Sequence, residues 1–150
     1  DPGVFDVTDY GAVGDNATEN TQAIALTFTA CRASPSPTKR VIFPAHNPAD
    51  QPAVYLVGPI DLSCNDTVVV VERGAVVKSV STTLHWPLGP DCPEPAQGLT
   101  SQQAAPFTMV QDVVNLTLTG GGVFDANGPM WWAEHCGNWW CPKWANATPT

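Results

Sequence analysis

The sequence has few basic residues and no long apolar segment. Six Lys and Arg face fourteen Asp and Glu among its 150 residues, which gives a formal net charge of −8 at pH 7. Such an acidic chain is a poor match for nucleic acid or for an anionic membrane surface. No apolar run approaches the roughly 20 residues that span a bilayer. We therefore expect a soluble protein with no nucleic-acid partner and no membrane partner.

Charged residues of both signs are also scarce, at 13% of the chain, whereas prolines number fifteen. Hydrophobic residues make up 43%, which is enough material for the core of one domain. This composition is typical of a turn-rich β protein and not of a disordered tail.

Two segments of the chain share one pattern. Residues 67–80 read TVVVVERGAVVKSV and residues 115–127 read NLTLTGGGVFDAN. In each segment an alternating run rich in β-branched residues, with Val69 and Val71 or Leu116 and Leu118, meets a glycine, Gly74 or Gly121, and a second short run follows. Glycine accepts a positive φ, so the chain can turn sharply there and begin another strand. The repeat predicts a strand, a tight corner and a second strand, wound into a coil.

The fold class expected is all-β, a right-handed parallel β-helix whose rungs occupy about residues 41–128. Residues 68–71 are four successive valines, which suits a strand covered on both faces. Stacked rungs with a continuous core accommodate both this run and the repeat. An antiparallel sandwich is the alternative, because short β runs do not fix a topology.

One helix is expected, at the N-terminal end of the coil. Helical spacing places five side chains on one side: Ala23, Ile24, Thr27, Phe28 and Cys31. Either Thr18 or Asn20 could serve as the N-cap. The open end of a β-helix exposes unpaired backbone groups and apolar interior, so we expect this amphipathic helix, about residues 18–31, to cap it. Before the helix, the alternating residues 4–10 predict a short strand.

Cysteines and glycosylation sequons together favour the secretory pathway. The five cysteines lack the C-x-x-C spacing of a zinc ribbon, so disulfides are expected. Four sequons begin at Asn16, Asn65, Asn115 and Asn146. Asn115 opens an expected strand, where its side chain could instead satisfy backbone groups. We expect a secreted eukaryotic protein whose N-terminus, which begins with Asp and has no signal peptide, is processed or trimmed.

Two disulfides are expected. Cys31 would pair with Cys64 and tie the helix to an early rung, and Cys136 would pair locally with Cys141. Cys92 would then be unpaired or bonded beyond this chain. The alternative for the second pair is a metal site with Glu134 and His135. The local disulfide is simpler, so we expect no metal and no cofactor.

The order of motifs allows a comparison with known families. Residues 5–15, FDVTDYGAVGD, resemble the first motif of many pectin-lyase-like β-helix proteins. More narrowly, YLVGPIDL at 55–62, VERGAV at 71–76 and GGVFDANG at 121–128 precede Trp131-Trp132. This ordered set resembles the N-terminal portion of glycoside hydrolase family 28, the polygalacturonases and their relatives. The resemblance covers nearly all of the chain.

That resemblance implies a secreted or cell-wall enzyme that hydrolyses pectin-type polysaccharide. The family's chemistry is carried by an Asn-Thr-Asp motif, an Asp-Asp pair, a Gly-His-Gly and an Arg-Ile-Lys, and this sequence contains none of them. We therefore expect no catalytic residue here and an active site beyond Thr150. Asp125 would be a hydrogen-bonding corner residue. The rest of the same protein, or a second chain, would complete the β-helix.

The last segment, residues 129–150, is expected to be a loop rich in Trp and Cys. Trp139, Trp140 and Trp144 could stack on sugar rings, or could instead pack the loop onto the coil or a partner chain. Basic residues are too few to attract a polyuronate, so that attraction would come from later residues. A non-catalytic β-helix component of an extracellular assembly is the alternative function. Sequons and cysteines disfavour a phage tailspike.

Overall fold

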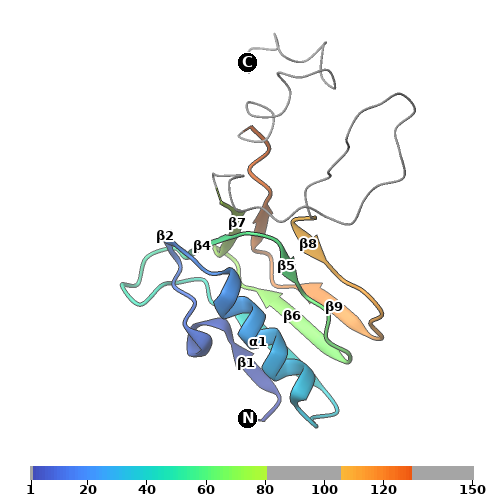
Figure 1. Cartoon of the computed structure of the whole chain (residues 1–150). Helices are drawn as coiled ribbons and strands as arrows, with labels where there is room; N and C mark the ends of the chain where they lie inside the picture. The colour runs from blue at the N-terminus through green and yellow to red at the C-terminus, as the bar shows by residue number, and fades with distance from the viewer. Residues whose placement is uncertain (1, 81–105, 130–150) are drawn as a thin grey trace, which may run out of the picture.

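The computed structural model describes residues 2–80 and 106–129, and there the strands form three parallel walls (Figure 1). The first wall contains, in order, β1 Val4–Asp6, β3 Lys39–Phe43, β6 Thr67–Val71 and β9 Leu116–Thr119. The second contains β2 Asp15–Glu19, β4 Val54–Val57, β7 Val76–Ser79 and β10 Val123–Asp125. The third contains β5 Ile60–Asp61 beside β8 Thr108–Met109.

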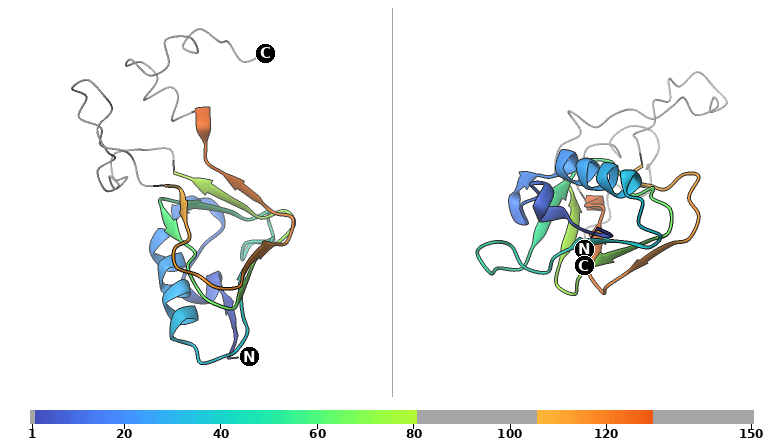
Figure 2. Two further views of the ribbon diagram at one scale, coloured as in Figure 1. Left: turned by 90° about the vertical axis from the view of Figure 1, so that its right-hand side faces the viewer. Right: turned by 90° about the horizontal axis from the view of Figure 1, so that it is seen from below.

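The chain visits the walls in the same order on each turn. One rung consists of β3, β4 and β5, the next of β6, β7 and β8, and a further rung begins with β9 and β10. The register is continuous, since Val41 pairs with Val69 and Val69 pairs with Leu118. The chain therefore forms a right-handed parallel β-helix, as predicted, and not an antiparallel sandwich (Figure 2).

The two segments with the shared pattern lie on successive rungs. β6 pairs with β9 and β7 pairs with β10, so each part of one segment stacks on its counterpart. The corner glycines have positive φ, 103° at Gly74 and 79° at Gly121. The predicted sequence of strand, corner and strand is therefore confirmed in both segments. The positive φ at each corner explains why glycine is found there.

Helix α1, Thr21–Ala33, takes the place of a third-wall strand in the first rung. It follows β2 and precedes β3, as β5 and β8 follow the second wall in later rungs, and it packs against β5. Its buried residues are Ile24, Thr27, Phe28 and Cys31, four of the five predicted from the spacing. The expected capping helix is present.

The core lies between the three walls and α1. Inward-facing valines from successive rungs, Val41 and Val69, are fully buried. Phe43 and Tyr55 meet edge to face with ring centroids 5.8 Å apart. Burial of each such side chain stabilises the fold by about 1.5–3 kcal/mol.

The structure corrects three expectations. Residues 4–10 are not one strand: after β1, residues Val7–Tyr10 form the 3-10 helix η1, because the Asp6 carboxylate accepts the Thr8 N–H at 2.9 Å and turns the chain. The coil begins with β1 and not near residue 41, since β1 already pairs with β3. Val68 is 38% exposed, whereas Val70 on the same face of β6 is buried, so the outer face of β6 is covered only in part.

Candidate functional site

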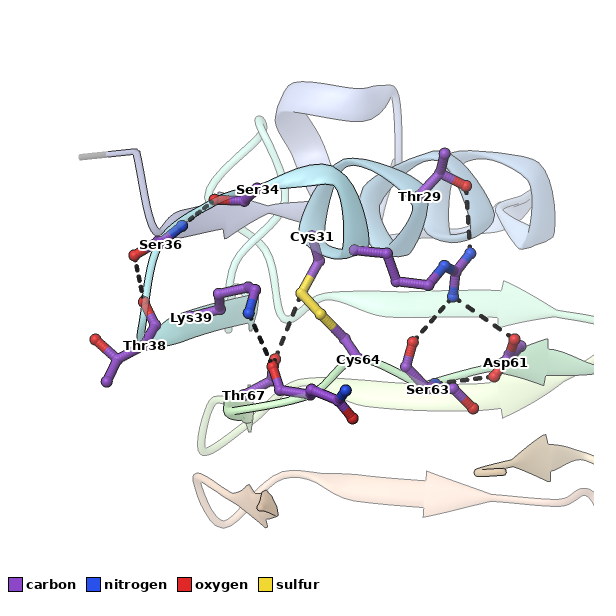
Figure 3. The surroundings of a disulfide bond; sticks show 12 residues. Thr29, Cys31, Ser34, Ser36, Thr38, Lys39, Asp61, Ser63, Cys64 and Thr67 are labelled. Carbon is purple, nitrogen blue, oxygen red and sulfur yellow. Dashed lines mark hydrogen bonds and ion pairs between the residues drawn. A yellow bond between two sulfur atoms is a disulfide. The ribbon is translucent and has the colours of Figure 1, made fainter. Parts of the chain in front are cut away.

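The last turn of α1 is fixed to the third wall by a covalent bond and by polar contacts (Figure 3). Cys31 and Cys64, the pair expected from the sequence, form a disulfide whose Cα atoms lie 6.4 Å apart. Arg32 Nη1 donates to the carbonyl oxygen of Ser63 at 3.0 Å and lies 3.6 Å from Asp61 Oδ2. Both charged side chains of this ion pair are more than 40% exposed, so it contributes little by itself.

The first turn of α1 is held to the same wall. The backbone N–H of Gly58 donates to Thr21 Oγ1 at 2.6 Å, and the Glu19 carboxylate accepts the Thr21 N–H at 2.9 Å. Contacts at both ends therefore align α1 with residues 58–63. Side chains of the helix supply polar partners that the backbone of a neighbouring strand would supply elsewhere in the coil.

Asn20 connects the first rung to the second. It is buried, and its Oδ1 accepts the Val13 N–H at 2.6 Å while its Nδ2 donates to the carbonyl oxygens of Thr18 and Leu56. Asn20 is the N-cap residue by position, but its side chain does not cap α1. One of the two expected N-cap candidates is therefore confirmed by position, but its amide contacts groups of both rungs and not the N–H groups of the helix.

The last described rung, β9 with β10, exposes its apolar interior, and we call it the end rung. Register with buried positions of β6 and β7 places Leu116, Leu118 and Phe124 on the inward face. Leu118 is 54% exposed, although Val69 directly beside it in the wall is fully buried. β9 and β10 are also terminal strands of their walls within the described residues. The end rung thus offers apolar surface and strand edges to a further layer.

The sequons of the described residues lie on two walls. Asn16 is exposed on β2 in the second wall. Asn65 and Asn115 are exposed and lie on successive rungs at the corner that leads into the first wall. The remaining expected site residues lie outside the described residues: Cys92, Glu134, His135, Cys136, Trp139, Trp140, Cys141, Trp144 and Asn146.

Two side chains have shifted pKa values for structural reasons. Hydrogen bonds donated by the backbone N–H groups of Thr18 and Ala17 and by the Thr18 hydroxyl lower the pKa of the Asp15 carboxyl. Burial raises the pKa of the Tyr55 hydroxyl, with smaller contributions from the charges of Asp6 and Glu72. Among the described residues, neither Asp15 nor Tyr55 belongs to a cluster of three or more His, Cys, Asp or Glu side chains that could hold a metal ion.

Asp125 behaves as the corner residue expected from the sequence. Its Oδ1 accepts the Asn127 N–H at 2.8 Å, and its Oδ2 lies 4.0 Å from Lys78 Nζ on the rung beside it. In residues 2–80 and 106–129, no three or more His, Cys, Asp or Glu side chains gather as a metal site would require. None of the helices in those ranges is long and apolar enough to cross a membrane.

Sequence reasoning missed the polar junction of α1 with the third wall. A basic residue in the last helical turn is a common partner for free carbonyl groups, and that signal could have singled out Arg32. No local pattern indicates that Thr21 receives the N–H of Gly58, 37 residues away.

The comparisons with known proteins agree with this architecture. No protein-family model matches the chain. An exopolygalacturonase of Arabidopsis thaliana is 28% identical over 139 residues, which are 91% of this chain and 26% of that protein. A polygalacturonase of Chamaecyparis obtusa is 29% identical over 133 residues, 89% of this chain and 22% of that protein. The chain thus spans about a quarter of the length of these relatives.

Two solved structures share the fold. The family 28 exopolygalacturonase of Yersinia enterocolitica is 27% identical, with a TM-score of 0.64 over 85% of this chain and 21% of that one. The hyperthermoactive exopolygalacturonase of Thermotoga maritima is 22% identical, with a TM-score of 0.64 over 98% of this chain and 30% of that one. The chain is polygalacturonase-like in sequence and in fold, as its motifs indicated.

Proposed function

On the basis of this polygalacturonase likeness, we propose that the chain is the N-terminal portion of a secreted, cell-wall-directed glycoside hydrolase that cleaves pectin-type polysaccharide. The observation that carries the proposal is the likeness, in sequence and in fold, to a family 28 exopolygalacturonase. The contribution of this chain is structural: a sealed first rung and a regular stack on which later rungs are built.

Catalysis in the intact protein would be inverting and would use two carboxylates. One carboxylic acid protonates the leaving oxygen and the other carboxylate activates a water, at a separation of about 6.5–9.5 Å. Neighbouring rungs stack at about 4.8 Å, so carboxylates one or two rungs apart provide that separation on a rigid wall. This sequence lacks the motifs that carry those groups in the family, and we place them beyond Thr150.

Hydrolysis by the protein that extends beyond Thr150 tests the proposal directly. We expect release of new reducing ends from polygalacturonate, and NMR of the first product should show an inverted anomeric configuration. Neutral polysaccharide of similar length is the control substrate. Secretion with no hydrolysis would instead support a non-catalytic wall component, and a retained anomeric configuration would contradict the two-carboxylate inverting mechanism.

The end rung allows a test of the structural role. Leu118 and Val123 have similar exposed fractions, 54% and 52%, but Leu118 faces inward whereas Val123 pairs with outward-facing Val76. If further rungs stack on the end rung, Leu118→Asp in the longer protein buries an unpaired carboxylate, and Val123→Asp does not. We expect Leu118→Asp to lower the thermal midpoint and the secreted yield strongly. Equal effects of the two substitutions would contradict stacking of further rungs.

A further inference from the structure

The sequon at Asn16 has a free amide in the irregular part of β2. Asn16 is exposed and has a φ of 58°, a left-handed conformation that asparagine tolerates better than most residues. The Asp15 carboxylate holds this segment by accepting the N–H groups of Ala17 and Thr18 at 2.9 and 2.7 Å. Within residues 2–80 and 106–129, the side chain of Asn16 makes no hydrogen bond. Its Nδ2 is available to solvent at no cost to the fold.

Asn65 uses only the oxygen of its amide. The Oδ1 atom accepts the N–H of Val114, on the next rung, at 2.9 Å. Among the described residues, its Nδ2 has no hydrogen-bond partner, and the residue is exposed. A substituent on Nδ2 leaves the Oδ1 acceptor intact, so the contact between rungs is compatible with modification.

Asn115 lies one rung further along the same corner. It uses the nitrogen of its amide, whereas Asn65 uses the oxygen. Its Nδ2 donates to Asp66 Oδ1 at 3.2 Å, and the Thr67 N–H donates to the Asn115 carbonyl at 3.1 Å. The amide nitrogen therefore points at the rung beside it. Asn115 is exposed, but its Nδ2 already contacts Asp66 on the rung beside it. An oligosaccharide on that nitrogen would replace one of its two N–H groups and crowd this contact between rungs.

We propose that Asn16 and Asn65 carry N-linked oligosaccharides and that Asn115 does not, because its amide nitrogen is an inter-rung donor. In the transfer, Nδ2 loses one proton and bonds to the anomeric carbon of an oligosaccharide. The bond from that carbon to the diphosphate of a polyprenyl-diphosphate donor breaks, and the diphosphate leaves. The inference rests on the proposed secretion, since this donor belongs to the secretory pathway.

Site mapping on the full protein, expressed in a eukaryotic secretory host, tests the proposal. Peptide-N-glycosidase converts an occupied asparagine to aspartate, which peptide mass spectrometry detects at each sequon separately, Asn146 included. We expect conversion at Asn16 and Asn65 and an unchanged asparagine at Asn115. Because the mapping uses the unmodified sequence, it does not depend on how a variant folds.

Two variants provide matched controls. Asn16→Asp keeps a residue that tolerates positive φ and should remove one oligosaccharide from the intact mass. Thr117→Ala destroys the third sequon but leaves the Asn115 amide in place, and it should change neither the glycan mass nor the thermal midpoint. By contrast, Asn115→Ala should lower the midpoint by several degrees with no change in glycan mass.

The outcomes separate the two proposals. Secreted protein with Asn115 occupied, or with Asn16 or Asn65 unoccupied, overturns the glycan assignment and leaves the proposed enzyme untouched. Protein that stays inside the cell and carries no glycan at any sequon overturns the assignment and the proposed secretion together.

Discussion

Cys31, in the last turn of α1, is bonded to Cys64, which follows β5, so a disulfide joins two elements that no backbone ladder can join. A helix satisfies its own N–H and C=O groups and has none left for a neighbouring strand edge. In the first rung of this coil the third wall therefore depends on side chains: Cys31, Arg32 and Thr21 make the contacts that strands make elsewhere.

Removal of this disulfide should loosen the first rung. The bond links residues 33 apart, and a loop of that length is worth roughly 2–4 kcal/mol by the chain-entropy argument. We expect Cys31→Ala combined with Cys64→Ala to lower the free energy of unfolding by that amount in chemical denaturation. Arg32→Gln, which breaks an exposed ion pair, should cost less than about 1 kcal/mol. Equal costs for the two would refute the dominant role of the disulfide.

Two glycines with positive φ should respond differently to alanine. A Cβ on Gly120, where φ is 114°, would overlap the backbone of Val71, whereas a Cβ on Gly11, where φ is 96°, meets nothing within 4 Å. Gly11→Ala should cost about 1–2 kcal/mol from backbone strain alone. Gly120→Ala adds overpacking, for a total of roughly 2–5 kcal/mol. Thermal denaturation that ranks Gly11→Ala as the worse substitution would contradict this account.

Asn20→Ala should destabilise the first two rungs. The substitution leaves the Val13 N–H without its partner and removes the Nδ2 contacts to Thr18 and Leu56. A buried group left unsatisfied costs about 1–3 kcal/mol. Hydrogen exchange should show faster exchange of the Val13 amide in the variant. Gln22→Ala, at an exposed position of α1, is the control and should leave that amide protected.

Tyr55 should make the fold sensitive to alkaline pH. Burial raises its pKa above the ordinary value of 10.0, so between that value and the folded pKa the unfolded chain loses the proton and the folded chain keeps it. The stabilising contribution is complete below pH 10 and is lost as the pH rises further. Tyr55→Phe should remove this part of the alkaline loss. At neutral pH it should cost about 1 kcal/mol, since the hydroxyl donates to the Pro44 carbonyl at 3.0 Å. An unchanged alkaline profile in denaturation experiments would exclude Tyr55 as the cause.

Local sequence patterns predicted most of the fold because the interactions behind them involve residues that are close together in the chain. Apolar residues at every second position of β6 and β9, and a glycine at each corner, depend only on neighbouring residues. The face of α1 followed from helical spacing in the same way. Residues 4–10 were predicted wrongly as one strand, since the capping contact of Asp6 with Thr8 competes with an extended backbone at the same sequence pattern.

What the sequence by itself determined is the coil, its repeat and its polygalacturonase likeness, because each follows from the order of residues along the chain. Only the tertiary structure decided which group lies beside which on the neighbouring rung. It placed α1 in the third wall, left Leu118 exposed beside buried Val69, and turned the Asn115 amide nitrogen toward Asp66. The residues that meet in these contacts lie between 29 and 49 positions apart in the sequence. The stacking of rungs sets that separation, and no local pattern encodes it.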